Sequence, residues 1–368
     1  MRFGDGRISG SLSVGLGALC VLAVLCFRYP EWLTTPDLRA ALPLDLVRTT
    51  LASATALSLG FGALCFALGG QRRLSFGGIA LSALAIALGG SWVDTPDSVS
   101  SQRYVGLDWF VLDLLVLAIV FLPLERLLSL HRDQRVFRPG WKTDLAHFFV
   151  SHLLVQLTVL LTLSPARLLL AGRVPAAVQD NVAALPVALQ FVLALLLADL
   201  FQYGAHRLMH AVPFLWRFHA IHHSSTRMDW LAGSRLHLAD IVFTRATSFL
   251  PLFALGIDET ALTAYLVFVS FQAVLIHANL RVRFGPLRWI LASPEFHHWH
   301  HSAEPEAIDR NFAVHLPVLD RIFGTAHLPG RWPASYGIEG DPVPEGWLSQ
   351  TLWPFRAHPP SKPRGEPR

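Results

Sequence analysis

Long apolar blocks alternate with short polar segments along most of the chain. Each block holds few or no charges and is long enough to cross a bilayer, which takes about 20 residues of helix. Six blocks precede residue 200, at about 8–27, 49–71, 74–93, 109–124, 145–166 and 181–198, and two follow at about 241–256 and 260–280. A short polar stretch around Asp258 separates the last two, which are therefore predicted to form a helical hairpin. The pattern predicts an all-α, polytopic membrane helix bundle.

The composition agrees with a membrane protein and excludes several other classes. Charged residues make up 15% of the chain, against roughly a quarter in soluble domains. The net charge of +4 comes without a dense basic run carrying interleaved aromatics, so nucleic-acid binding is not predicted. Cys20, Cys26 and Cys65 lie inside apolar blocks, which favours neither a disulfide framework nor a thiolate metal site. The first block follows Arg2 and Arg7 but is too long for a signal-peptide core, so a retained helix is predicted.

Basic residues in the short loops predict the topology, because such residues favour the cytoplasmic side. One loop holds Arg72 and Arg73, and the segment 132–142 holds three arginines and a lysine. Two predicted crossings separate these loops, so both are assigned to the cytoplasm. Continuing the count places the ends of the blocks near Asp199 and His277 on the cytoplasmic face as well. The histidine-rich segments described next are therefore predicted to form a cap on that face.

Histidines are concentrated in one part of the chain, with 11 of the 17 between residues 206 and 301. His206 and His210 are four residues apart, which places both on one face of a helix. Two HxxHH motifs follow, and two single histidines lie between these motifs. The predicted metal ligands are His206, His210, His219, His222, His223, His237, His277, His297, His300 and His301. These spacings are typical of metal ligation.

A single i, i+4 histidine pair occurs often by chance, but three clusters within a hundred residues indicate a metal site. His298 adjoins His297 and is expected to point away from the ligand face. His147 and His152 lie in an apolar block, where either a structural polar contact or the lining of a substrate tunnel explains them. Imidazole suits Fe, Zn, Cu and Ni alike. The ligand number exceeds the need of one tetrahedral zinc, which indicates two metal ions.

The kinds of residue in the clusters exclude two familiar metal sites. An HExxH zinc-protease motif is absent, because Arg207 and Leu208 follow His206. Ferritin-like di-iron sites use bridging glutamates and Glu-x-x-His pairs, whereas these clusters hold histidine alone. A histidine-rich di-iron site therefore remains as the prediction.

Three segments carry a family resemblance: DLFQYGAHRLMH at 199–210, WRFHAIHHS at 216–224 and SPEFHHWHHS at 293–302. They resemble the three histidine boxes of the fatty acid hydroxylase and sterol desaturase superfamily of integral membrane enzymes. Asp309, Asn311, Asp320 and the run 323–325 are similar to the closing segment of that superfamily. The resemblance covers about 141–327.

The resemblance implies a di-iron centre that uses O2 and external electrons to hydroxylate or desaturate a lipid taken from the bilayer. It assigns the three boxes as ligands together with His277, whereas Leu238 departs from the family pattern after His237. The implied electron donor is a cytochrome b5-like protein, a ferredoxin or a flavin reductase. Asp199 lies seven residues before His206 on the same helix face, and we expect it to orient a ligand imidazole. Helix capping or pairing with Arg207 is the alternative role for Asp199.

The predicted domains are amino-terminal helices at 1–135, a catalytic domain at 136–327 and a proline-rich soluble tail without helix periodicity at 328–368. Two other functions are compatible with the histidine pattern. The first is oxidative cleavage of an ether lipid or an aldehyde by the same site. The second is a non-catalytic membrane protein that binds or transports metal, which would distribute ionisable groups along the spans.

Overall fold

The computed structural model describes residues 6–69, 71–96, 104–154, 173–338 and 343–356, together with residues 161, 168 and 170. Apart from two isolated bridges, these residues form helices and loops. Two compact units divide the chain at Val116 and Leu117, within helix α6 (Leu107–Leu127). The predicted boundary between the amino-terminal helices and the catalytic domain, at residue 135, stays a prediction.

Unit 1 contains a bundle of three apolar helices, α1 (Arg7–Arg28), α4 (Leu44–Ala67) and α5 (Arg72–Ala87). Small side chains let these helices approach closely, as is usual for helices in membranes. The hydroxyls of Ser13 and Ser58 each donate to the other's carbonyl at 2.7 Å, and Ser82 donates to the Ser58 hydroxyl at 2.7 Å. Unit 1 also contains the short elements α2 (Pro30–Leu33), α3 (Pro36–Ala41) and η1 (Gly90–Trp92), together with the first part of α6.

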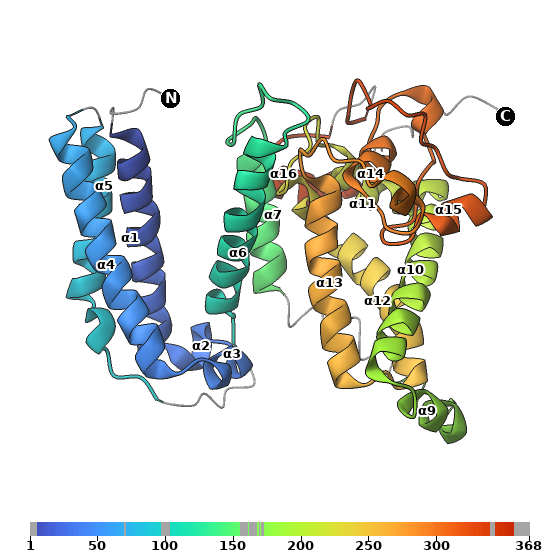
Figure 1. Ribbon diagram of the computed structural model, residues 1–368, viewed down its shortest axis with the longest axis horizontal. Helices are drawn as coiled ribbons and strands as arrows, with labels where there is room; N and C mark the ends of the chain where they lie inside the picture. The colour runs from blue at the N-terminus through green and yellow to red at the C-terminus, as the bar shows by residue number, and fades with distance from the viewer. Residues whose placement is uncertain are drawn as a thin grey trace. The chain divides into compact units, whose positions relative to one another are not determined.

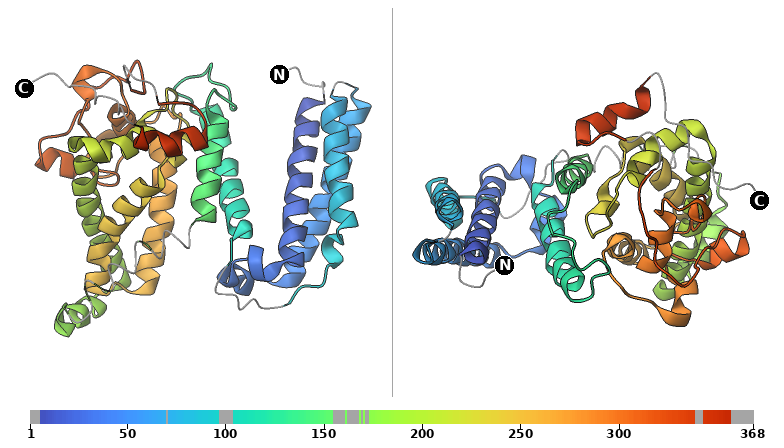
Figure 2. Two further views of the ribbon diagram at one scale, coloured as in Figure 1. Left: turned by 180° about the vertical axis from the view of Figure 1, so that it is seen from behind. Right: turned by 90° about the horizontal axis from the view of Figure 1, so that it is seen from above.

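Unit 2 is built on three long helices that pack together, α10 (Val187–Ala211), α12 (Leu238–Leu255) and α13 (Glu259–His277). Ala194 and Ala198 of α10 pack against Leu252 and Tyr265 in its core. The other elements are α7 (Trp141–Leu153), α9 (Ala176–Ala183), α11 (Pro213–His223), η2 (Ala232–Ser234), η3 (Gly285–Trp289), α14 (Pro294–His300), η4 (Pro305–Ala307), α15 (Val318–Ile322), α16 (Trp347–Leu352) and η5 (Trp353–Phe355). Figures 1 and 2 show the segment from about 280 to 338, in orange, gathered at one end of α10 and α13.

Local sequence signals fix the ends of these helices. Gly256 ends α12 in the left-handed conformation at φ 63°, and the Asp258 side chain accepts from Thr260 N to begin α13. The predicted helical hairpin is therefore confirmed. Pro213 opens α11, and α14 begins with Pro294 after the Ser293 side chain, which accepts from Phe296 N. Proline at the first helical position and serine before it are favourable because the first amides of a helix lack partners within it.

Seven of the described helices are long and apolar enough to cross a membrane, which confirms the predicted class. They are Ser9–Arg28, Leu44–Ala67, Arg72–Trp92, Leu107–Leu127, Val187–Ala211, Leu238–Leu255 and Glu259–His277. In the predicted block 145–166, α7 extends to Leu153, and most of the rest lies outside the described residues. The block predicted at 181–198 is too short, because α10 continues to Ala211 and carries His206 and His210, the first two predicted metal ligands.

The segment predicted as a soluble tail at 328–368 contains a short helix, and its assignment as a separate domain stays a prediction. Trp347–Leu352 forms α16, which is too short to show an apolar period in the sequence. The following Trp353 is buried against Trp216 and Ile221 of α11. The tail therefore forms part of the packing behind the histidine segments.

Candidate metal centre

Four helices bring histidines to one end of unit 2. His206 and His210 lie in the last two turns of α10, and His277 is the last residue of α13. Helix α11 contributes the first HxxHH motif, and α14 with the next residue, His301, contributes the second. All of these imidazoles are at most 6% exposed. Two helices that end at the same level thus meet two short helices that carry the HxxHH motifs.

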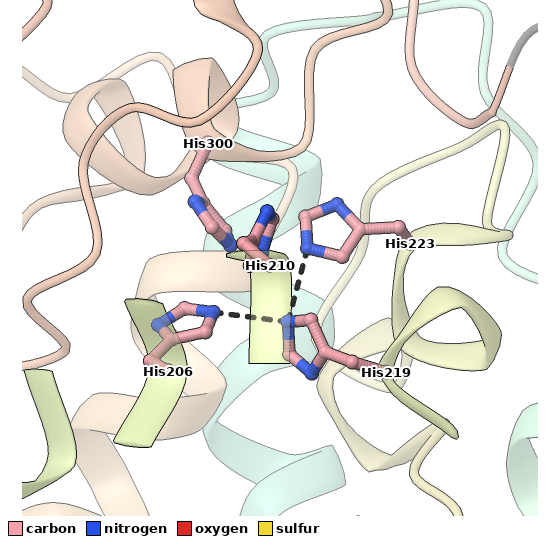
Figure 3. A group of neighbouring side chains, drawn as sticks. All are labelled: His206, His210, His219, His223 and His300. Carbon is pink, nitrogen blue, oxygen red and sulfur yellow. Dashed lines mark hydrogen bonds between the residues drawn. The ribbon is translucent and has the colours of Figure 1, made fainter. Parts of the chain in front are cut away.

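Nine histidines form two groups, in each of which the candidate ligand nitrogens lie within 4.8 Å of one another. Group one holds His206, His210, His219, His223 and His300, and group two holds His222, His277, His297 and His301. Figure 3 shows the side chains of group one turned toward one another. Two nitrogens on opposite sides of one ion lie about 4.2 Å apart, given a metal–nitrogen bond of about 2.1 Å. Each group therefore has the dimensions of one metal site.

The HxxHH motifs interleave the two groups. In the first motif His219 and His223 join group one, and His222 joins group two. The second motif is divided in the opposite sense, since His297 and His301 join group two and His300 joins group one. On a helix, the side chains of residues i and i+4 point in nearly the same direction. The side chain of residue i+3 points to the opposite side of residue i from that of residue i+4. This spacing lets each short helix serve both groups.

The two groups lie against each other. The ring centroids of His223 and His301 are 4.5 Å apart, and those of His297 and His300 are 5.2 Å apart. Within the groups, Nε2 of His219 lies 3.0 Å from Nε2 of His206, and Nε2 of His297 lies 3.0 Å from Nε2 of His277. The Nε2 atoms thus converge on two adjacent centres.

A single loop orients three rings of group one through their Nδ1 atoms. His210 contacts the Asp309 carboxylate at 3.2 Å, His300 contacts the Arg310 carbonyl at 2.8 Å and His206 contacts the Phe312 carbonyl at 2.7 Å. Asp309 and Asn311 have positive φ angles of 59° and 56°, which residues other than glycine seldom adopt. These left-handed residues let three nearly consecutive residues face the same group. Such contacts fix the ring and its tautomer, leaving Nε2 to bind metal.

The fourth oriented ring of group one is that of His219. Its Nδ1 lies 2.8 Å from the carboxylate of Asp240, which is 1% exposed. Asp240 lies in the first turn of α12, so this helix also positions the site.

A second loop orients group two. His222 Nδ1 contacts the Arg235 carbonyl at 3.2 Å, and His277 Nδ1 contacts the Ala273 carbonyl of its own helix at 2.6 Å. Gly233 lies flat against the ring of His277, because a Cβ atom at position 233 would lie 2.8 Å from Nδ1. Only glycine fits at this position without displacing a ligand.

Buried ion pairs hold this second loop in place. Arg138 donates to both oxygens of Asp229, at 2.7 and 2.8 Å, and to Asp144 at 2.6 Å. Asp144 also accepts from Arg235 at 2.5 Å, and all four side chains are at most 6% exposed. The basic segment before α7 therefore lies at the same end of unit 2 as the histidines. The predicted topology requires such a common end for the basic segment and the histidines.

Burial favours the neutral, metal-binding form of five imidazoles of the two HxxHH motifs. Loss of solvent, together with the neighbouring imidazoles, lowers the pKa of His222, His223, His297, His300 and His301 well below the usual range. Metal ligation requires the neutral ring. The buried Nε2 of His300 has no hydrogen-bond partner, an arrangement that would cost free energy unless another group binds there. The nitrogen donor set and this atom both fit a pair of metal ions.

Two predicted site residues lie elsewhere. His237 belongs to neither group: it precedes α12, its Nδ1 accepts from Ala239 N at 3.0 Å, and its Nε2 lies 3.2 Å from the Thr351 carbonyl. The expected contact between Asp199 and an imidazole is wrong. The Asp199 carboxylate accepts from the backbone amides of residues 314, 315 and 316 at 3.0, 3.1 and 2.6 Å. It supports the segment that follows the orienting loop.

Two further histidines fill structural places. His298 points away from both groups, as expected, but is fully buried, with its nitrogens on the Tyr336 hydroxyl and the Ala278 carbonyl. His147 contacts the Leu236 carbonyl at 3.0 Å and Gln350 at 2.8 Å, which favours the structural alternative over the tunnel lining.

Sequence reasoning missed Asp240 and the buried ion pairs. Asp240 is three residues from His237, so an acid near a candidate ligand was the available signal. Two of the three ion pairs join residues about 90 positions apart, and no local pattern reveals these two.

The fold and the site define an all-helical, multi-pass membrane protein with a buried histidine centre for metal ions. Residues 191–325, which include all nine grouped histidines, match the family described as fatty acid hydroxylase. Over these residues the match confirms the family resemblance seen in the sequence.

Named relatives share this part of the chain. An ornithine lipid hydroxylase from Rhizobium tropici is 38% identical over 172 residues, which are 46% of this chain and 51% of the relative. An alkylglycerol monooxygenase from Danio rerio is 35% identical over 133 residues, which are 36% of this chain and 29% of the relative. A very-long-chain aldehyde decarbonylase from Oryza sativa subsp. indica is 26% identical over 134 residues, 33% of this chain and 21% of the relative. The chain thus spans about half or less of these relatives, and no solved structure matches it significantly.

Proposed function

We propose that this protein is a membrane di-iron oxygenase that hydroxylates a lipid, using O2 and external electrons. The convergence of nine buried histidines into two adjacent groups carries the proposal. Bound iron would supply the oxidant that breaks an unactivated C–H bond, chemistry that side chains alone do not provide. The chain holds the ions, orients their ligands from two loops and keeps bulk water from the imidazoles.

The depth of the site favours a substrate from the bilayer. His206 lies about 29 Å along α10 from its first residue and His277 about 27 Å along α13, at 1.5 Å per residue. A hydrocarbon core is about 30 Å thick. If these helices cross the bilayer, the histidine groups lie near its surface, where a lipid places its head group and the first carbons of its chains.

The names of two relatives, a hydroxylase and a monooxygenase, favour hydroxylation over desaturation. Conversion of C–H to C–OH consumes one O2, two electrons and two protons and releases one water. The electrons must come from a separate donor, for which a cytochrome b5-like protein, a ferredoxin and a flavin reductase are the candidates. The positive loop 132–142 at the same end supports a site on the cytoplasmic face.

Oxidative cleavage of an ether lipid is a second candidate, favoured by the similarity to alkylglycerol monooxygenases. Hydroxylation of the carbon beside an ether oxygen gives a hemiacetal, which separates into an alcohol and an aldehyde. The same site serves both outcomes, and the substrate decides between them.

Lipid profiling under labelled O2 tests both candidates. Cells with the wild-type chain are compared with cells carrying His222→Ala, grown under 18O2. We expect a lipid that gains one labelled oxygen only with the wild type. A labelled aldehyde with loss of an ether lipid would instead select cleavage, and identical lipid profiles in the two cultures would contradict both functions.

A further inference from the structure

The two histidine groups differ in how their outer nitrogens are held. In group one, four of the five rings have Nδ1 in contact with a protein oxygen, and for His210 and His219 that oxygen belongs to a carboxylate. In group two, two of the four rings have such a contact, and both partners are neutral carbonyls. The Nδ1 atoms of His297 and His301 are buried without a hydrogen-bond partner.

These contacts change the strength of the ligand. An imidazole that donates Nδ1–H to a carboxylate has a more basic Nε2, and its ring is held in the orientation for binding. Behind His222 the partner is only the neutral backbone carbonyl of Arg235. Group one also offers five nitrogens against four. Ligand number, ligand basicity and ring orientation all favour tighter metal binding by group one.

We infer that the two ions are held unequally, tightly by group one and in an exchangeable manner by group two, with Asp240 as the main positioning residue of the tight site. The inference rests on the proposed function only in requiring that two ions bind. Asp240 touches no substrate in this account. It acts through His219, by fixing the ring and raising its basicity.

Release of iron to a chelator tests the inference without any substrate. The full chain, purified in detergent and loaded with iron, is mixed with an excess of a ferrous chelator, and release is followed by absorbance. We expect two phases of equal amplitude with rates at least about tenfold apart. Asp240→Asn is expected to accelerate the slow phase about 10- to 100-fold and to leave the fast phase unchanged. Asp258→Asn, at the start of α13, is the matched control.

Several outcomes would overturn the inference. The first is iron release from the wild type in a single phase. The second is a change in only the fast phase of release from the Asp240→Asn variant. If Asp240→Asn fails to fold, Asp309→Asn tests the same relation through His210, because the Asp309 side chain is 42% exposed. Biphasic release from a chain that oxidises no lipid would contradict the proposed function alone, and single-phase release from an active chain would contradict this inference alone.

A separate observation concerns an exposed patch formed by η3 and α15. The Arg321 guanidinium lies 4.7 Å from the ring centroid of Trp289, and Arg288 lies 5.5 Å from the same centroid. Large apolar side chains around this pair are exposed: Leu287 60%, Ile290 61%, Ile322 69% and Phe323 46%. Contiguous apolar exposure with arginines marks a binding surface.

The position of the patch along α10 indicates its partner. Phe323 stacks on Tyr203 with ring centroids 4.9 Å apart. Tyr203 lies about 24 Å along α10 from its first residue, at 1.5 Å per residue, near the level at which the helix leaves the hydrocarbon. Apolar side chains with arginine and tryptophan at this level suit the lipid interface, where arginine attracts anionic head groups. We propose that this patch docks onto anionic lipid head groups beside the metal centre.

Hydrogen–deuterium exchange in nanodiscs tests the docking. One preparation contains phosphatidylcholine alone, and the other contains about one third phosphatidylglycerol. We expect slower exchange at 285–291 and 318–323 in the anionic discs, and loss of that difference in Arg288→Gln/Arg321→Gln. The control is Arg72→Gln/Arg73→Gln in unit 1. Equal exchange in both lipids would contradict the proposal, and protection that instead rises with protein concentration would assign the patch to a second copy of the chain.

Discussion

Single residues decide whether each imidazole reaches its metal. The sequence shows which histidines share a helix face, but the atoms that orient them are mostly backbone carbonyls and two carboxylates. Gly233 and Asn311 illustrate what spacing does not reveal. Position 233 needs glycine because the ring of His277 leaves no room for a Cβ atom. Position 311 needs asparagine because the backbone is left-handed there and the side chain makes three hydrogen bonds.

Gly233→Ala is expected to weaken group two selectively. The new Cβ atom would lie 2.8 Å from His277 Nδ1, so the ring must move away from the position that faces His222 and His297. We expect a 10- to 100-fold loss of affinity at one of two sites, in the range found when the support of a ligand is changed. Iron titration by calorimetry measures it. Gly204→Ala, where a Cβ meets nothing within 4 Å, is the control, and unchanged affinity in Gly233→Ala would refute the assigned contact.

Asn311→Gly is expected to destabilise the folded chain by about 3 kcal/mol, because three hydrogen bonds of about 1 kcal/mol each are lost. Asn311→Ala should cost a further ~1 kcal/mol, since alanine resists the left-handed conformation. The midpoint of thermal unfolding, monitored by size-exclusion fluorescence, ranks the variants. An alanine variant as stable as the glycine variant would show that the backbone conformation is unimportant.

At the scale of elements, the sequence predicted much of the helical framework but not the loops. Apolar blocks identified the seven membrane-length helices, because burial in lipid requires continuous apolar sequence. The i, i+4 and HxxHH spacings identified eight of the nine grouped histidines, because a helix fixes its own side-chain directions. The loops at 229–237 and 309–316 depend on contacts with distant elements, which local sequence does not encode. The role of Asp199 was assigned incorrectly for this reason.

Asp199→Ala is expected to destabilise the fold through the 314–316 segment. Three buried amides lose their acceptor, at about 1–3 kcal/mol each, so we expect a loss of about 3 kcal/mol or more. Molecules that remain folded should keep the spectroscopic signature of their iron, because Asp199 touches no ligand ring. The exposed Asp133→Ala is the control. A changed iron spectrum at unchanged stability would restore the original expectation of a direct contact.

At the scale of the whole molecule, the metal centre is predicted to lie at one face of the membrane. The ion pairs of Arg138 with Asp229 and Asp144 bring the basic segment to the same end of unit 2 as the histidines. The turn between α12 and α13 belongs to the other end of these helices. The basic residues predict a cytoplasmic location for the histidine end.

Cysteine labelling in intact cells checks this topology. We expect Glu259→Cys, in the turn between α12 and α13, to react with a membrane-impermeant maleimide from outside. Asp133→Cys should react only after permeabilisation. The native cysteines are buried and supply the background. The opposite labelling pattern would place the metal centre on the other face.

The central claim is that the nine converging imidazoles hold two metal ions, one in each group. Elemental analysis of the freshly purified full chain, combined with a density map of the protein, tests it most directly. The account predicts two iron atoms per folded chain, one among the Nε2 atoms of each group. A folded chain that binds a single ion, or none, after reconstitution with ferrous iron would contradict it.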